Sequence, residues 1–147
     1  MTLDPKVWGP HYWFVLHTIA ISYPKYPNKV IKKKMYDFIQ NLPLFLPIEE
    51  IGNNFSKFLN KYPVTPYLDS RKSLMRWVHF IHNKINISLN KPEITFEKSI
   101  AKYYEHYKPI EIKLKEIKVY QEKKMFFIVL FLLLITISIL IYYYYFK

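Results

Sequence analysis

Apolar side chains recur every three or four residues in five stretches of the chain, and prolines or short polar runs separate these stretches. Spacing of this kind predicts amphipathic helices. Proline suits the first turn of a helix and disfavours helical backbone in the residue before it, so Gly9-Pro10 marks a start and Tyr23-Pro24 a stop. We expect helices over about residues 9–23, 28–42, 47–62, 70–91 and 95–107.

Each expected helix carries one apolar stripe that can face a common core. Trp13 and His17 lie four residues apart on the first helix, so they share a face. The second helix is expected to begin near Asn28, and Asp69 is the expected N-cap of the fourth helix. The stripes of the later helices are Ile31, Met35, Phe38 and Leu42; Ile48, Ile51, Phe55, Phe58 and Tyr62; Leu74, Trp77 or Val78, Ile81, Ile85 and Leu89; Phe96, Ile100 and Tyr103 or Tyr104. The pattern predicts one small helical domain.

A different pattern fills the C-terminal part of the chain. Residues 125–146 contain no charged side chain, and these about 22 residues suffice to cross a bilayer core of about 30 Å. Lys123 and Lys124 precede this stretch, and Tyr142 to Tyr145 form an aromatic belt at its far end. We expect a single-pass C-terminal tail anchor. Because lysines crowd its N-terminal flank, the folded domain is expected on the cytosolic side.

The segment between the helical domain and the apolar stretch has an undecided period. From Ile110 to Glu122, apolar residues fit both strand and helix spacing, so this segment is interpreted as a linker that can extend the membrane helix. The expected organisation is a helical domain over residues 1–108, a basic juxtamembrane linker over 109–124 and a transmembrane segment over 125–146.

The composition of the chain limits the cofactors, reactions and partners that it can have. The chain has no cysteine, which excludes disulfides, cysteine-ligated zinc, iron–sulfur clusters and thiol redox chemistry within it. Its net charge is +11, but the lysines are spread among helices and do not form an arginine-rich stripe with stacking aromatics. An anionic membrane surface is therefore the expected partner, and nucleic acid is not.

Other chemical patterns in the sequence are weak. Glu49 and Glu50 are adjacent on a helix, so they point to different faces and suit its positive N-terminus better than acid–base catalysis. His79 and His82 have a spacing that metal ligands use, but no third ligand follows at a matching interval, and we assign no metal.

Two ordered segments carry a more specific signal. The ordered residues are Gly9-Pro10-His11-Tyr12-Trp13-Phe14-Val15-Leu16-His17-Thr18, Tyr23-Pro24, Leu46-Pro47, Phe55, Ser70-Arg71, Trp77, His82-Asn83, Ile85-Asn86, Leu89 and Lys91-Pro92. On these residues the chain resembles the FAD-linked sulfhydryl oxidase family, to which the augmenter of liver regeneration and relatives in large DNA viruses belong. The resemblance covers about two thirds of the chain.

This resemblance implies a fold and a cofactor. The fold is all-α, a four-helix bundle with a short fifth helix, to which this chain adds its C-terminal transmembrane helix. The cofactor is FAD, and aromatic faces, histidine and asparagine donors and a lysine suit a flat ring system with a diphosphate. The resemblance implies that FAD is lined by Gly9, Trp13, His17, Tyr23, Phe55, Trp77, His82, Asn83, Asn86 and Lys91. Taken singly, the aromatic and histidine residues among them are equally typical of a core.

The redox centre of the family is missing. Ile48 and Ile51 occupy the positions of its two reactive cysteines, and His79 and Phe96 occupy those of its second, structural pair. Isoleucine is neither nucleophile nor electron relay, so dithiol oxidation by the family route is expected to be lost. We expect a membrane-anchored, flavin-binding pseudo-oxidase with a scaffold or regulatory role.

Other interpretations stay open at this point. The chain could serve disulfide formation together with a cysteine-bearing thiol oxidase, or it could be a flavin-free structural membrane protein. The resemblance implies a homodimer, and the use of cytosol-facing members by large DNA viruses points to a virion or an intracellular membrane of an infected cell.

Overall fold

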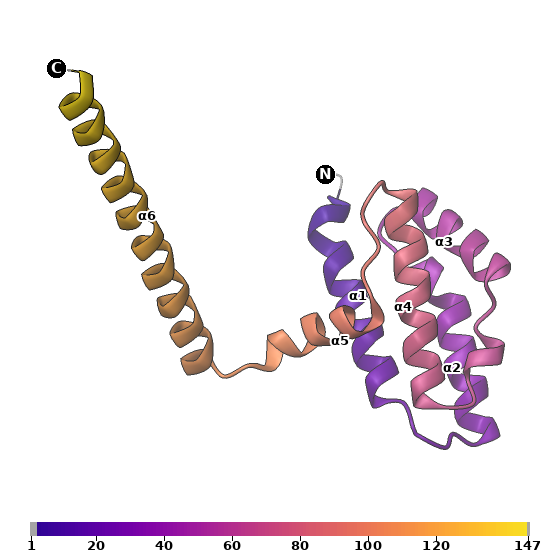
Figure 1. Cartoon of the computed structure of the whole chain (residues 1–147). Coiled ribbons are helices and arrows are strands. Elements are labelled where there is room, and N and C mark those ends of the chain that lie inside the picture. Colours follow the sequence, from indigo (N-terminus) through magenta and orange to yellow (C-terminus); the bar gives the residue numbers. More distant parts are fainter. Residues whose placement is uncertain (1–2, 147) are drawn as a thin grey trace. The chain divides into compact units, whose positions relative to one another are not determined.

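The computed structural model describes residues 3–146, and the regular elements of this part of the chain are α-helices and 3-10 helices, without strands (Figure 1). The predicted all-α class is confirmed. The elements are α1 (Pro5–Ser22), α2 (Lys29–Asn41), η1 (Leu42–Phe45), α3 (Glu49–Lys61), η2 (Thr65–Tyr67), α4 (Arg71–Ser88), α5 (Phe96–Tyr104), η3 (Glu105–Tyr107) and α6 (Ile110–Phe146). The chain divides into two compact units, residues 1–103 and 104–147. The three-part division at 108 and 124 stays a prediction.

The first helix begins earlier than predicted. Asp4 is its N-cap and accepts a hydrogen bond of 2.8 Å from the backbone N–H of Lys6, while Pro5 occupies the first helical position. Pro10 therefore lies inside α1, and the predicted start at Gly9-Pro10 is wrong. The Asp4-Pro5 pair is itself a signal for a helix start. Aspartate accepts hydrogen bonds from the first backbone N–H groups, and proline has no N–H group that would need a partner. The helix ends before Tyr23-Pro24, as predicted.

Capping residues fix the other helix starts in the bundle. Asn28 caps α2, since its side-chain oxygen accepts from the N–H of Ile31 at 2.9 Å. The N-cap of α4 is Ser70 and not the predicted Asp69, whose carboxylate forms an ion pair with Lys32 instead. Both capping interactions satisfy backbone donors that a helix leaves unpaired at its start.

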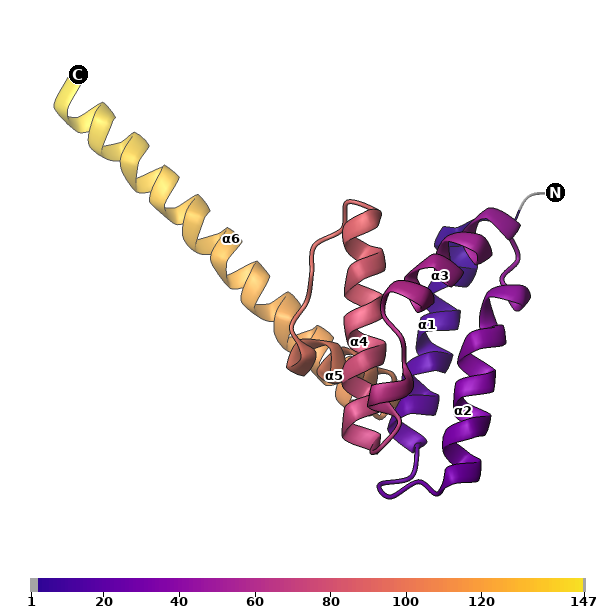
Figure 2. The same ribbon diagram turned by 90° about the vertical axis from the view of Figure 1, so that its right-hand side faces the viewer.

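The core of the first unit lies between α1 and α4 and is closed by α2 and α3 (Figure 2). Trp77 of α4 is only 2% exposed, and its indole N–H donates to the carbonyl of Tyr62 at 3.1 Å. On α3 the buried side is Gly52, Phe55 and Leu59. The predicted stripe of that helix is shifted, because its other members are only half-buried. The remaining core residues include Leu16, Ala20, Ile39, Val64, Leu68, Leu74, Val78 and Ile81.

Gly52 permits a close approach between α3 and η1. A Cβ atom built on Gly52 would lie 2.5 Å from the carbonyl oxygen of Pro43. This separation is far below van der Waals contact, so only glycine fits without moving one of the two backbones. The contact fixes the start of α3, which carries Ile48 and Ile51, against the preceding turn.

The second unit is dominated by α6, which has 37 residues and is about 55 Å long at 1.5 Å per residue. It is long and apolar enough to cross a membrane. The segment Ile110 to Glu122, whose period was undecided, is helical and continuous with the apolar stretch. At the start of this unit, Lys108 forms ion pairs with Glu105 at 2.8 Å and with Glu116 at 3.0 Å.

Candidate functional site

Three rings from two helices meet inside the first unit. The indole of Trp13 on α1 stacks on the imidazole of His82 on α4, with ring centroids 4.0 Å apart and planes within 3°. His17, one turn after Trp13, lies with its Nε2 3.2 Å from Nδ1 of His82. Phe55 of α3 lies beside these rings and meets Trp13 edge to face, with ring centroids 6.4 Å apart. The three-ring cluster of Trp13, His17 and His82 joins sequence segments more than sixty residues apart.

Both histidines of the three-ring cluster are held neutral. The pKa of His17 is lowered to about 4, mainly by burial and to a smaller extent by the nearby His79. Burial also lowers the pKa of His82, to about 3, and the neighbouring rings of His17 and His79 act in the same direction. Near pH 7 the three-ring cluster is therefore aromatic and uncharged. One of its two imidazoles donates a hydrogen bond that the other accepts.

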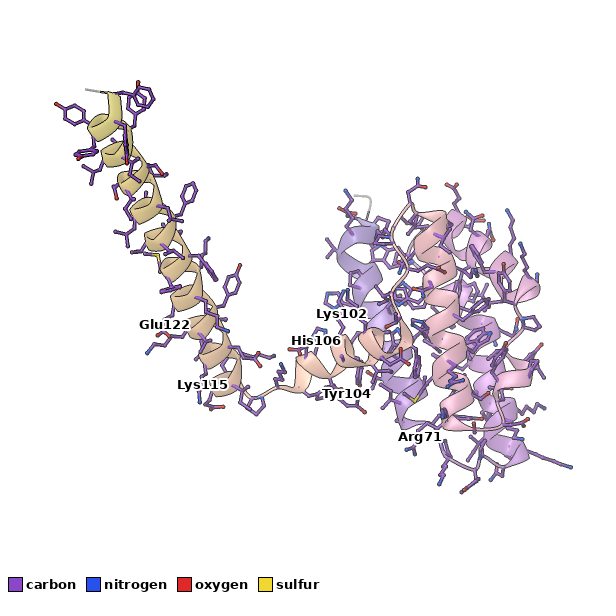
Figure 3. The ribbon with its side chains drawn as sticks, viewed as in Figure 1. Arg71, Lys102, Tyr104, His106, Lys115 and Glu122 are labelled. Carbon is purple, nitrogen blue, oxygen red and sulfur yellow. The ribbon has the colours of Figure 1, made fainter. Side chains whose placement is uncertain are left out.

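Positive charge lies next to this neutral surface. The charges of Lys102 and Lys91 also depress the pKa of His82. Lys91 follows α4 in the connection to α5, and Lys102 lies on α5 (Figure 3). Lys91 was among the residues singled out from the sequence, whereas Lys102 was not. No local pattern reveals Lys102, because its relation to His82 depends on how α5 packs in the fold.

Tyr103 is a second residue near the site that the sequence did not single out for it. Its side chain is buried, its hydroxyl lies 3.0 Å from Oγ1 of Thr18, and its ring stacks on Phe14 at 5.3 Å. The helical period did place Tyr103 on an apolar stripe. These contacts fasten α5 to α1, so they also fix the position of Lys102.

Tyr23 and Trp77, both expected to line a cofactor, lie in the hydrophobic core. The hydroxyl of Tyr23 donates to the carbonyl of Leu68 at 3.0 Å, and the tyrosine is 2% exposed. Arg71 donates through Nε to the carbonyl of Tyr23. Trp77 is equally buried and bonded to Tyr62. Both aromatic side chains therefore support the bundle from inside its hydrophobic core.

The polar residues after His82 mainly order the backbone that follows α4. The side-chain amide of Asn83 is bonded to the peptide of Ile94. The carbonyl of Asn86 accepts from the backbone N–H of Lys91 at 2.8 Å. Gly9, at the other end of the predicted site, has open space on its Cβ side, since no atom lies within 4 Å of a Cβ built there.

The positions of the missing redox centre lie at the start of α3. Ile48 is the N-cap and Ile51 lies in the first turn, and both are half-buried. Glu49 and Glu50 occupy the same turn and are exposed, as expected for acidic groups at a helix N-terminus. The turn before α3 is held by the hydroxyl of Tyr12, which donates to the carbonyl of Phe45 at 2.7 Å. Nothing in this turn can form a thiolate.

The residues of the cluster fit FAD by their chemistry. Flat faces of Trp13 and His82 suit a stacked ring system, and neutral imidazoles can exchange hydrogen bonds with ring nitrogens and carbonyls. Lys91 and Lys102 supply the charge that a diphosphate requires. These groups come from α1, α4, the connection that follows α4 and the last turn of α5.

Comparisons with known proteins identify the family of the chain. The model of the Erv1/Alr family matches residues 10–108. A probable FAD-linked sulfhydryl oxidase of Acanthamoeba polyphaga mimivirus is 33% identical over 67% of this chain and 69% of its own length. The FAD-linked sulfhydryl oxidase of African swine fever virus is 32% identical over 69% of this chain and 89% of its own.

A solved structure gives the same result for the fold. The FAD-binding domain of Erv1 from Saccharomyces cerevisiae aligns with a TM-score of 0.61 at 30% identity, and the alignment covers 65% of this chain and 89% of that domain. FAD is thus the cofactor for which these relatives are named. The sequence, the helical fold and the family match together show that the chain belongs to the Erv1/Alr family of FAD-linked sulfhydryl oxidases.

Proposed function

We propose that this chain is a membrane-anchored flavin-binding member of the family that no longer oxidises dithiols and serves as a scaffold or regulator. The observation that carries the proposal is the contrast between two parts of one bundle. The three-ring cluster of Trp13, His17 and His82 is intact, while isoleucines stand at both positions of the redox pair. The two histidines are bonded to each other, and His82 also stacks on Trp13, so the arrangement that suits a flat ring system is present without the thiols that would react with it.

The residues that would hold FAD are those of the cluster and its two neighbouring lysines. Trp13 and His82 offer faces for stacking, and His17 offers a neutral nitrogen for hydrogen bonding. Lys91 and Lys102 would neutralise the diphosphate. When bound, the flavin supplies two-electron redox chemistry, and the surrounding apolar core excludes water from it.

The family reaction needs groups that this chain lacks. Oxidation of two thiols to a disulfide, with reduction of O₂ to H₂O₂, passes in the family through a protein disulfide beside the flavin. Without any cysteine, this chain can neither exchange with a substrate thiolate nor pass the electron pair to the ring. Ile48 and Ile51 place apolar bulk at the two positions where that exchange would begin.

The long apolar helix supports the membrane part of the proposal. α6 can span a bilayer with its apolar stretch, and Lys123 and Lys124 at the boundary favour a cytosolic location for the preceding residues. Each lysine near an anionic leaflet adds about 1 kcal/mol of attraction. A homodimer, and a thiol oxidase as a partner, belong to the same proposal through the family resemblance.

Oxygen consumption of the purified full-length chain in mild detergent, with saturating FAD and dithiothreitol, tests the loss of activity. We expect the rate of free FAD alone. The variant Ile48→Cys with Ile51→Cys is the matched positive control, because it returns the relay to an otherwise unchanged bundle. Dithiol oxidation by the unmodified chain well above the rate of free FAD would refute the pseudo-oxidase proposal.

A further inference from the structure

Four residues fasten the segment after α4 back onto that helix, and we call them the α4–α5 clasp: His79, Asn83, Ile94 and Phe96. The side-chain amide of Asn83 donates from Nδ2 to the carbonyl of Ile94 at 2.9 Å. The backbone N–H of Ile94 donates to Oδ1 of Asn83 at 3.3 Å. The amide group thus pairs with one peptide through both of its ends, which fixes the position and the orientation of that peptide.

The second half of the clasp is aromatic. Nε2 of His79 lies 3.3 Å from Nδ2 of Asn83, so the amide has acceptors for both of its hydrogens. The imidazole of His79 meets the ring of Phe96 edge to face, with centroids 5.5 Å apart and planes at 76°. The guanidinium of Arg76 lies over the same ring at 5.9 Å. His79 and Phe96 thus make a non-covalent contact at the positions where the resemblance implies a second cysteine pair.

The clasp controls where two lysines lie. Hydrogen bonds hold the backbone at Lys91 and three residues later. The backbone N–H of Lys91 donates to the carbonyl of Asn86, and the carbonyl of Ile94 accepts from the side chain of Asn83. Between them the backbone reverses through Asn90, which has a left-handed φ of 55°. Lys102 lies on α5, the helix that begins at Phe96 of the clasp. Both lysine charges act on His82, one residue before Asn83.

We propose that Asn83, with His79 and Phe96, is a positioning group that sets Lys91 and Lys102 at the diphosphate of a bound flavin dinucleotide. This inference rests on the proposed FAD binding. It assigns Asn83 to the backbone that carries the cations and not to the flavin ring. Loss of the clasp should therefore weaken ligands with a diphosphate and spare riboflavin, which has the ring system but no phosphate.

The test compares the affinities of FAD and riboflavin, measured by quenching of flavin fluorescence, for the full-length chain and for Asn83→Leu. Leucine has the same branched arrangement of heavy atoms but makes neither hydrogen bond. We expect the Kd for FAD to rise about tenfold, the equivalent of one or two lost hydrogen bonds. The Kd for riboflavin should change by less than about twofold. Ser88→Ala is the matched control on the same helix, because Ser88 is exposed and bonds only within its own turn.

A disulfide in place of the clasp distinguishes loss of positioning from unfolding of the Asn83→Leu variant. In the Asn83→Leu background, His79→Cys with Phe96→Cys adds the only two cysteines of the chain. Closing this disulfide should restore FAD affinity to within about threefold of the unmodified chain, and dithiothreitol should abolish the rescue. Equal weakening of FAD and riboflavin, or no rescue by the disulfide, would overturn the positioning role. Failure of the unmodified chain to bind either ligand would instead overturn the proposed function, and with it this inference.

Discussion

Gly52 offers a test of the packing that places the start of α3. In Gly52→Ala, the new Cβ would lie 2.5 Å from the carbonyl oxygen of Pro43, whereas ordinary contact begins at 3.4 Å. The backbone of α3 or of η1 must therefore move by about 0.9 Å, the difference between these distances. The obstacle is a buried main-chain carbonyl and not the end of a flexible side chain, so the strain cannot be relieved by a rotamer change.

The expected magnitude is a balance of two terms. Overpacking of a rigid contact costs about 1 to 3 kcal/mol. Alanine in a helix interior returns about 1 kcal/mol relative to glycine. We therefore expect Gly52→Ala to lower the free energy of unfolding by about 1 kcal/mol net, up to about 2 kcal/mol.

Gly9→Ala is the matched control. It places the same methyl group in a helix, but no atom lies within 4 Å of the new Cβ. This variant should gain about 0.5 to 1 kcal/mol from helix propensity alone. The chain has two glycines, so these two variants are all of its possible glycine-to-alanine substitutions.

Urea unfolding followed by tryptophan fluorescence measures both variants. The three tryptophans lie on α1 and α4, so the signal reports the bundle and not α6. Measured in detergent without added flavin, the two midpoints should move in opposite directions. A Gly52→Ala variant as stable as Gly9→Ala would show that α3 and η1 do not approach as closely as the structure has them.

Three further predictions concern the site and the caps. Burial lowers the pKa of His17 to about 4 and that of His82 to about 3, against 6.5 in the unfolded chain, so the unfolded chain takes up protons first as the pH falls. Stability should therefore fall as the pH drops from about 6.5 towards about 3, and urea midpoints of His82→Gln should show a shallower acid slope. If the slope were unchanged in that variant, His82 would not be the buried neutral group described. Ile48→Cys with Ile51→Cys should produce dithiol-dependent H₂O₂ release in the presence of FAD, and continued inactivity with flavin bound would show that the site has diverged beyond its relay. Asn28→Ala should cost about 1 kcal/mol of stability through loss of the α2 cap, measured by the same urea titration, whereas no loss would contradict that cap.

Much of the fold followed from local sequence signals. Apolar periodicity and proline stops predicted the five helices of the first unit, and uncharged length predicted the long apolar C-terminal helix. The misplaced start of α1 came from giving weight to Gly9-Pro10 over the cap at Asp4-Pro5. The period of residues 110–122 was undecided because alternating apolar and charged residues fit two structures, and continuity with the apolar helix decides it.

The site was predictable only in part. Helical spacing put Trp13 and His17 on one face of a helix and put His82 on α4. It could not show that Nε2 of His17 lies 3.2 Å from Nδ1 of His82. That contact depends on the packing of α1 against α4. Lys102 was missed for the same reason, since its proximity to His82 comes from the way α5 is fastened to α1 and α4.

The most direct test of the account is the visible spectrum of the full-length chain, purified in mild detergent, together with identification of the cofactor released on denaturation. The account predicts yellow protein that carries one FAD per chain, and a Trp13→Ala, His82→Ala double variant that is folded and colourless. A folded, colourless unmodified chain that takes up no added FAD would contradict flavin binding and leave only the helical fold of the family.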